Sequence, residues 1–288
     1  MGASVRRVMA VATLTFREAL RRKIVIAAAV MSLGFLALYG LGLHFAAADL
    51  LKQSSNGLDE LMMRAAAAQM LYIGLLPASF IIGLTAVLAS VGTISSELES
   101  GVIYGVVARP IRRAELVLGK FLGLGSMLAV YALLLNGAIV ALARWQIHSP
   151  LTDWPSALAL LAFEPLIISG LALLGSTRLP TLANGVLCAA VYATGFVGGF
   201  IEQIGGLMRN HTMMNLGVVS SLLMPLDAIH RKAVALLIPG GLLLGGGAPG
   251  AGGFGESTTP SVWMVVYAVA YVLVCVWGAT RIFGKRDL

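Results

Sequence analysis

Long apolar runs dominate the chain, and six of them are long enough to cross a bilayer. A transmembrane helix needs about 20 mainly apolar residues to span the hydrocarbon core. Lipid offers no hydrogen-bond partner to the backbone, so each run is expected to be an α-helix. The pattern therefore predicts an all-α integral membrane protein with six spans. The expected spans are Ile24–Phe45, Leu71–Gly92, Phe121–Ala143, Ser156–Gly175, Leu182–Ile201 and Val262–Ile282.

A seventh apolar stretch, Leu216–Leu244, lacks the continuity of the other six. Its interruptions are Pro225, Asp227, His230, Arg231, Lys232 and Pro239. Proline ends or kinks a helix, and charged groups are costly inside a bilayer. We therefore expect a broken or re-entrant helical pair before the last span. It would belong to an extracytoplasmic segment, residues 202–260, that ends in a flexible glycine-rich stretch.

The first 23 residues combine apolar and basic side chains with a helical period. One predicted face carries Val5, Val8, Met9, Ala12, Phe16 and Leu20, and another carries Arg6, Thr13, Arg17 and Arg21. Such a helix suits a membrane surface, so residues 1–23 are expected to form an amphipathic, interfacial cytoplasmic helix. A solvated basic segment before the first span is the alternative. The following apolar run, about 22 residues, exceeds the roughly 7 to 15 of a signal peptide, which favours a retained span.

Composition supports a membrane protein made of one domain. Of the 288 residues, 58% are apolar and only 11% are charged, and the mean hydropathy is +0.90. A soluble domain of this length could not cover its surface with so few polar groups. No stretch is polar enough for a separate soluble domain, so residues 1–288 are expected to form a single transmembrane domain. Cys188 and Cys275 lie in apolar runs, where cysteine behaves as a small hydrophobic residue, so we expect no disulfide.

Basic residues indicate the orientation of the spans, because they gather on the cytoplasmic side of membrane proteins. With a cytoplasmic start and six crossings, 14 of the 20 Lys and Arg residues lie inside. A seventh crossing would move the basic C-terminal residues outside. The distribution predicts a multi-pass protein of the plasma (cell inner) membrane with both termini in the cytoplasm. It also accounts for the net charge of +7 without a nucleic-acid partner.

The sequence lacks the motifs that would indicate catalysis, nucleotide binding or metal binding. Gly119-Lys120 is followed by Phe121 and has no upstream glycine at the required spacing, so G-x-x-x-x-G-K-[ST] is absent. The four histidines have no metal-ligand spacing, and no G-x-S-x-G turn occurs. We therefore predict no catalytic residue, no metal and no cofactor held by this chain.

Two features inside the predicted spans are candidates for function or assembly. Glu164 precedes Pro165 in the fourth span, where a carboxylate costs roughly 2.5 to 3.5 kcal/mol, so it is a candidate for a polar pathway. A structural or interfacial acid is the alternative. Gly195 and Gly199 form a G-x-x-x-G face on the fifth span that lets another helix approach closely. This face could serve packing within the subunit or a dimer interface.

Residues 93–120, between the second and third spans, are far more charged than their surroundings. Gly101 permits a tight turn after the acidic part. Pro110 disfavours helix at Arg109, so one element is expected to end before Arg112 starts another. The residues that mark this segment are Glu97, Glu99, Gly101, Arg109, Pro110, Arg112, Arg113, Glu115 and Lys120.

The charged segment resembles the permease subunits of type-two ABC exporters. In that family the second span runs into E-x-E-x-G-[TV]-[IL], then R-P-[IV]-x-R, then a helix reading [EK]-[LF]-[VL]-x-G-K. The matching residues are Glu97, Glu99, Gly101, Val102 and Ile103, then Arg109, Pro110, Ile111 and Arg113, then Glu115, Leu116, Val117, Gly119 and Lys120. The stretch TFREALRRKIVI also looks like the interfacial helix of the family.

This resemblance implies a permease that works with partners. A separate cytoplasmic ATPase would bind and hydrolyse ATP, and two permease copies, identical or related, would enclose a pathway in the lipid bilayer. Residues 93–120 would be the coupling segment on which the ATPase acts, and a loop anchored at lipid headgroups is the alternative. The alternative functions are a scaffold or regulatory subunit of an ABC-type complex and a membrane-embedded enzyme. Few charges in the spans favour an amphiphilic, lipid-like or peptide substrate.

Overall fold

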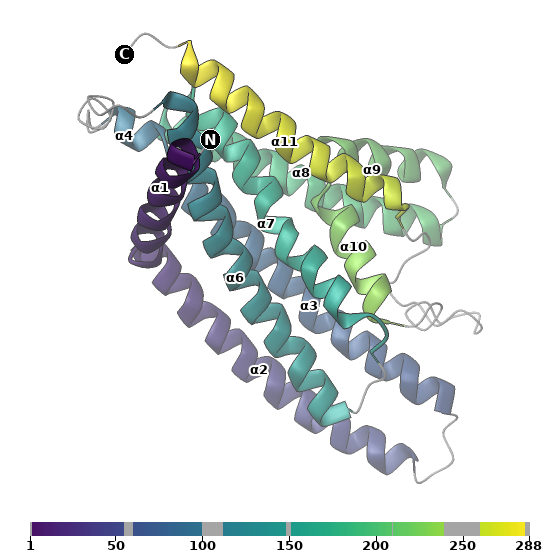
Figure 1. Cartoon of the computed structure of the whole chain (residues 1–288). Helices are drawn as coiled ribbons and strands as arrows, with labels where there is room; N and C mark the ends of the chain where they lie inside the picture. Colours follow the sequence, from purple (N-terminus) through teal and green to yellow (C-terminus); the bar gives the residue numbers. More distant parts are fainter. Residues whose placement is uncertain are drawn as a thin grey trace.

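Helices form nearly all of the structure, a computed structural model that describes residues 2–54, 60–99, 112–147, 151–208, 210–238 and 260–285 (Figure 1). No strand occurs in these ranges. Six helices are long and apolar enough to cross a membrane, which confirms the six predicted spans. They are α2 (Lys23–Ser54), α3 (Glu60–Ser90), α6 (Arg113–Ile147), α7 (Trp154–Ser176), α8 (Thr181–Leu207) and α11 (Val262–Gly284).

Three of these helices extend well beyond the apolar runs that predict them. Helices α2, α3 and α6 contain 32, 31 and 35 residues. At about 1.5 Å per residue they are about 45 to 55 Å long, against a hydrocarbon core of about 30 Å. Each must therefore project beyond that core or cross it at a tilt. The charged first turn of α6 can accordingly lie outside the hydrocarbon.

The spans differ in how much of their surface the rest of the chain covers. In the most apolar 18 residues of each helix, 67% are buried in α3 and 61% in α7, against 11% in α2 and 28% in α11. Helices α3 and α7 are thus central, and α2 and α11 present apolar side chains to the surroundings. One buried cluster around them includes Leu71, Leu75, Ile82, Ile139 and Leu161.

The N-terminal helix α1 (Gly2–Leu20) lies against the first half of α6 (Figure 1). Glycine makes this close approach possible, because a Cβ at Gly119 would lie 3.0 Å from the Val8 carbonyl oxygen. The residues of the predicted apolar face of α1 therefore lie in two environments, the bundle interior and the exposed surface. Ala12 is buried against the bundle, whereas Val5 and Met9 remain exposed beside the exposed basic residues of α1.

The interrupted apolar stretch forms two helices, α9 (His211–Leu223) and α10 (Leu226–Leu237), that meet at an angle of 102°. Helix α9 begins just after α8 ends. At the other end, the backbone N–H groups of Thr152 and Asp153, before α7, donate to carbonyl oxygens of the last α10 turn at 3.2 and 3.0 Å. Both ends of the pair thus lie at the same end of the bundle, as expected for the predicted re-entrant segment. Its glycine-rich continuation lies outside the described residues.

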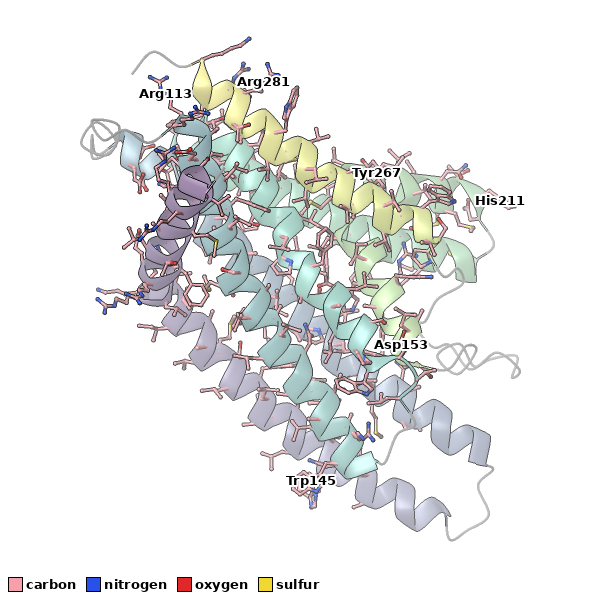
Figure 2. The ribbon with its side chains drawn as sticks, in the orientation of Figure 1. Arg113, Trp145, Asp153, His211, Tyr267 and Arg281 are labelled. Carbon is pink, nitrogen blue, oxygen red and sulfur yellow. The ribbon has the colours of Figure 1, made fainter. Side chains whose placement is uncertain are left out.

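Helix α1 and the end of α11 both contact the start of α6, where the Ser4 hydroxyl of α1 donates to Glu115 at 2.7 Å. Arg113, at the start of α6, donates to the Gly284 carbonyl oxygen at the end of α11, at 3.5 Å. Figure 2 shows Arg113 and Arg281 at the end of the bundle that holds both termini, with Asp153 and Trp145 away from it. This arrangement agrees with an even number of crossings. That this end faces the cytoplasm remains a prediction from the basic residues.

Candidate functional site

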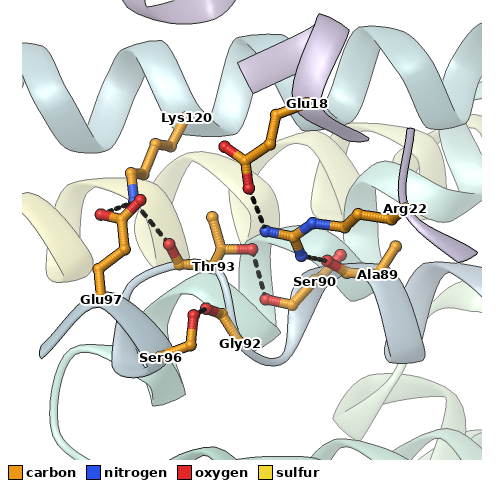
Figure 3. Close-up of polar contacts among 9 residues, drawn as sticks. All are labelled: Glu18, Arg22, Ala89, Ser90, Gly92, Thr93, Ser96, Glu97 and Lys120. Carbon is orange, nitrogen blue, oxygen red and sulfur yellow. Dashed lines mark hydrogen bonds and ion pairs between the residues drawn. The ribbon is translucent and has the colours of Figure 1, made fainter. Parts of the chain in front are cut away.

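The predicted charged segment begins with a short helix, α4 (Ser95–Glu99), that is tied to α6 by an ion pair (Figure 3). Lys120 is only 5% exposed, and its ammonium pairs with the Glu97 carboxylate. The same ammonium donates to the Thr93 carbonyl oxygen at 2.6 Å. A buried Lys needs such partners because desolvation of an unpaired charge is costly. Lys120 thereby holds the turn between α3 and α4 against α6.

Glu99 connects the same short helix to α8. Its Oε1 accepts a hydrogen bond from the backbone N–H of Thr181, the first residue of α8, at 2.8 Å. The Ser95 and Thr181 hydroxyls lie 2.9 Å apart and form a second link. The first N–H groups of a helix have no partner within the helix, so an acid in this place both satisfies a donor and favours the helix dipole. Any displacement of α4 therefore acts on α6 and α8 together.

Glu115 joins α1 to the start of α6. It is 4% exposed and accepts hydrogen bonds from the Ser4 hydroxyl at 2.7 Å and the Arg7 guanidinium at 3.0 Å. It also accepts from the Arg112 backbone N–H at 3.2 Å, the bond that an acid in the first helical turn makes in a capping box. The segment's third acid is thus engaged within the chain, as Glu97 and Glu99 are.

A further ion pair fixes the turn between α1 and α2. The Arg22 guanidinium binds Glu18 at 2.8 Å and donates to the Ala89 carbonyl oxygen, near the end of α3, at 3.3 Å (Figure 3). We call the polar contacts at this end of the bundle the end cluster. Its members are Glu18, Arg22, Glu97, Glu99, Glu115 and Lys120, with their partners.

The remaining predicted residues of the charged segment are less engaged or lie outside the described part. Arg112 is exposed, and Arg113 is half-buried against the end of α11. Gly101, Arg109 and Pro110 lie outside the described residues. Within the described part, Glu99 and Arg112 are therefore the charged residues of this segment that are exposed to a partner.

Glu164, the predicted acid of the fourth span, faces the interior of the bundle. It is 1% exposed and accepts a hydrogen bond from the Ser79 hydroxyl of α3 at 2.8 Å. Its other oxygen lies 3.0 Å from Nδ1 of His230 in α10. A carboxylate among apolar spans requires such polar partners. Glu164 thereby connects α3 and α7 to the re-entrant pair.

The residue after His230 forms a second buried contact. The Arg231 guanidinium, 4% exposed, binds both oxygens of Glu202 in α8, at 2.9 and 2.7 Å. Its Nε lies 2.9 Å from the Asp227 carboxylate, one turn earlier in α10. The planar guanidinium suits such a two-pronged carboxylate contact. We call Glu164, Glu202, Asp227, His230 and Arg231 the inner cluster.

The predicted G-x-x-x-G face of α8 receives the re-entrant pair. A Cβ at Gly195 would lie 2.8 Å from the Met224 Cβ, at the bend between α9 and α10. A side chain at Gly199 would collide with the Asp227 carboxylate. The small residues therefore serve close packing within the chain, which is one of the two roles that the sequence suggests.

A small cavity lies beside the inner cluster. Its volume is about 20 Å³. Its lining includes Tyr72, Leu76, Ser79, Phe196, Phe200, Gln203, Leu226, Asp227 and His230. This volume can hold about one water molecule. The polar residues here thus leave too little space for a solute, and passage along them would require the helices to move.

Sequence reasoning finds only part of the inner cluster. Glu164 stands out as an acid within a span, and Asp227 and Arg231 are four residues apart, which places them on one helix face. Glu202 has no such signal, because its partner is 29 residues away. No group of three or more His, Cys, Asp or Glu in the described ranges could hold a metal ion.

Comparison with known families gives one match. The family model described as "ABC-2 family transporter protein" matches residues 9–288, nearly the whole chain. Among curated proteins, none has a sequence that matches this one.

Proposed function

Since the chain belongs to the ABC-2 family of transporter proteins, we propose that it is the permease subunit of an ATP-driven ABC exporter. The family match over nearly the whole chain carries this proposal. Six apolar helices of spanning length support it, because they make the chain a multi-pass integral membrane protein. The transported substrate would cross the membrane along this subunit.

ATP hydrolysis is assigned to a separate cytoplasmic ATPase, because the sequence has no phosphate-binding loop. The segment 93–120 would be where that ATPase acts on the permease. Helix α4 is suited to this role, since Glu97 links it to α6 and Glu99 links it to α8. A displacement of α4 by the ATPase would reach two spans directly.

Two permease copies, identical or related, would enclose the pathway. In the described part of the chain, the cavity beside the buried polar residues holds only about 20 Å³, which favours a path that forms between subunits or after helix movement. Glu164 is the candidate pathway residue, because it is buried beside that cavity and contacts the re-entrant pair. An amphiphilic or lipid-like substrate suits walls that carry so few charges.

The proposal is tested by co-expression with an ABC ATPase encoded beside this chain. A stable complex should form, and the permease should stimulate ATP hydrolysis. Inverted membrane vesicles should accumulate a fluorescent lipid analogue or an apolar peptide only with ATP. The matched control is an ATPase whose phosphate-loop lysine is replaced. A complex without ATP-dependent accumulation of any probe would instead favour a scaffold or regulatory subunit, and catalysis by the isolated chain would favour a membrane-embedded enzyme.

The proposed topology has its own test. Single cysteines introduced in a C188A/C275A background should react with an impermeant thiol reagent from outside at Gln53 and Ser257. Cysteines at Arg112 and Lys285 should react only after the membrane is opened. Labelling of position 285 from outside would contradict six crossings with both termini in the cytoplasm.

A further inference from the structure

A cationic cleft opens at the end of the bundle where both termini lie. Its volume is about 410 Å³, and its lining is Thr177, Arg178, Arg281, Ile282 and Lys285. The three basic side chains are exposed and come from two places, the turn between α7 and α8 and the end of α11. None of the three forms an ion pair with a carboxylate in the described part of the chain. The cleft is therefore suited to an anion.

A second basic cleft at the same end of the bundle contains an acid among its basic side chains. It is lined by Leu14, Arg17, Glu18, Arg21 and Arg22. Here the Glu18 carboxylate lies within the lining and pairs with Arg22 at 2.8 Å. An acid inside the cleft offsets part of its positive charge. The acid lowers the net positive charge of the second cleft, which therefore provides an internal control for the first.

Exposed apolar surface continues from the walls of the first cleft. On α11, the Arg281 guanidinium lies 5.1 Å from the centre of the Trp277 ring, and that indole is 60% exposed. Leu273 and Val274 on the next turn are also exposed. Tryptophan beside a basic residue is typical of the boundary between headgroups and hydrocarbon. The cleft thus sits where an apolar span meets polar surroundings.

The wall of the cleft on the side of α8 also continues into exposed apolar surface. Helix α8 starts directly after Arg178 and Pro180, and Leu182 and Val186 in its first turns are 82% and 64% exposed. Helix α7 packs against both α8 and α11, so these two helices flank it. A ligand that reaches from the cleft along these helices must combine an anionic group with apolar chains. An acidic protein surface supplies anionic groups but no acyl chains.

We propose that this cleft binds the phosphate of an anionic phospholipid, with the acyl chains along the exposed faces of α8 and α11. Arginine binds phosphate through two parallel N–H groups, and long basic side chains reach a headgroup while their stems stay in apolar surroundings. This site would hold a lipid at the rim of the subunit, adjacent to the turn that joins two spans. The inference rests on the membrane embedding of the chain and not on its pairing with an ATPase.

Trp277 provides a direct test. The full chain is placed in vesicles that contain phosphatidylglycerol or phosphatidylcholine with identical brominated chains, which quench nearby indoles. Subtracting the signal of the Trp277→Phe variant isolates Trp277. Phosphatidylglycerol should reach half-maximal quenching at a mole fraction on the order of tenfold below that for phosphatidylcholine, since each basic residue adds attraction for an anionic lipid. The R178Q/K285Q variant, which leaves Arg281 over the indole, should reduce this preference to about twofold.

The control removes the same charge from the same end of the bundle. R17Q/R21Q should retain the preference for phosphatidylglycerol, and all variants should melt within a few degrees of the wild type because the replaced residues are exposed. Inorganic phosphate should not displace the lipid at matched ionic strength. The proposal is overturned by equal quenching from both lipids, by an equal loss in the control, or by displacement with free phosphate. Loss of ATPase association in R178Q/K285Q, with lipid preference intact, would assign the cleft to a protein partner instead.

Discussion

The end cluster and the inner cluster use the same chemistry in different surroundings. Both join several helices through acid–base contacts. In the end cluster, Glu99 and Arg22 lie near water and bind backbone groups at helix ends, and Arg22 also pairs with Glu18. In the inner cluster, Arg231 and Glu202 are enclosed among the spans. The comparison indicates that the exposed contacts of the end cluster can break and re-form at a small cost in free energy. The buried contacts of the inner cluster, in contrast, set the position of the re-entrant pair.

The physical reason is desolvation. Exposed ion pairs contribute about 0 to 1 kcal/mol, because water replaces either partner easily. Breaking a buried pair by removing one partner costs about 3 to 5 kcal/mol, because the other charge stays in a medium of low polarity. A segment that must respond to a partner is therefore better tied by contacts of the first kind. Lys120 and Glu115 are the exceptions at that end, since both are buried as deeply as the inner residues.

The largest effect is expected from Arg231→Gln. This change removes the cation between the carboxylates of Glu202, which is buried, and Asp227, which is 14% exposed. We expect a loss of about 3 to 5 kcal/mol and a melting temperature roughly 10 °C lower, measured by circular dichroism in detergent. Lys232→Gln, which removes one positive charge at the next position, should shift the melting temperature by at most about 2 °C. Equal shifts in the two variants would mean that the inner cluster does not hold the re-entrant pair.

The second largest effect concerns Glu97 and Lys120. Glu97→Lys places two cations together and should destabilise the chain by about 1 to 3 kcal/mol, because the Lys120 ammonium loses its ion pair while buried. The exchange variant E97K/K120E restores the pair and should recover most of the melting temperature. ATPase association, measured by co-purification, should stay impaired in the exchange variant if the sign of the charge at position 97 matters to the partner. Full recovery of both properties would make this ion pair purely structural.

A smaller change in stability is expected from Glu164→Gln. The amide keeps the size of the side chain and can still accept from Ser79, so the loss should be about 1 kcal/mol and the amount of protein in the membrane near normal. Transport should nevertheless fall several-fold, because the anionic group between α7 and α10 is gone. The control Ser79→Ala removes the neutral partner only and should reduce transport less. Unchanged transport in Glu164→Gln would leave a structural acid.

The smallest effect is expected from Glu18→Gln. The Glu18–Arg22 pair joins the last turn of α1 to the turn before α2 and is partly exposed, and Arg22 keeps its bond to the Ala89 carbonyl oxygen. Such pairs contribute about 0.3 to 0.5 kcal/mol, so the melting temperature should move by less than about 2 °C. A shift comparable to that of Arg231→Gln would remove the distinction between the two clusters.

The sequence by itself determined the membrane architecture. Apolar runs of about 20 residues and their interruption near Pro225 are local features, and lipid leaves helix as the only way to satisfy the backbone. The six spans and the bent pair follow from this. The sequence also determined the family, because the charged segment from Glu97 to Lys120 retains a specific order of residues.

The tertiary structure alone decided which charges meet. Glu164 and His230 are 66 residues apart, and Glu115 and Arg7 are separated by 108. The hydrophobic pattern determines where a helix forms and which residues share one of its faces. Which two faces come into contact depends on how the helices cross, and the shapes of many side chains together set that crossing. Gly199 illustrates the point. Its lack of a side chain marks a possible close approach, and only the packing of α10 against α8 places the Asp227 carboxylate there.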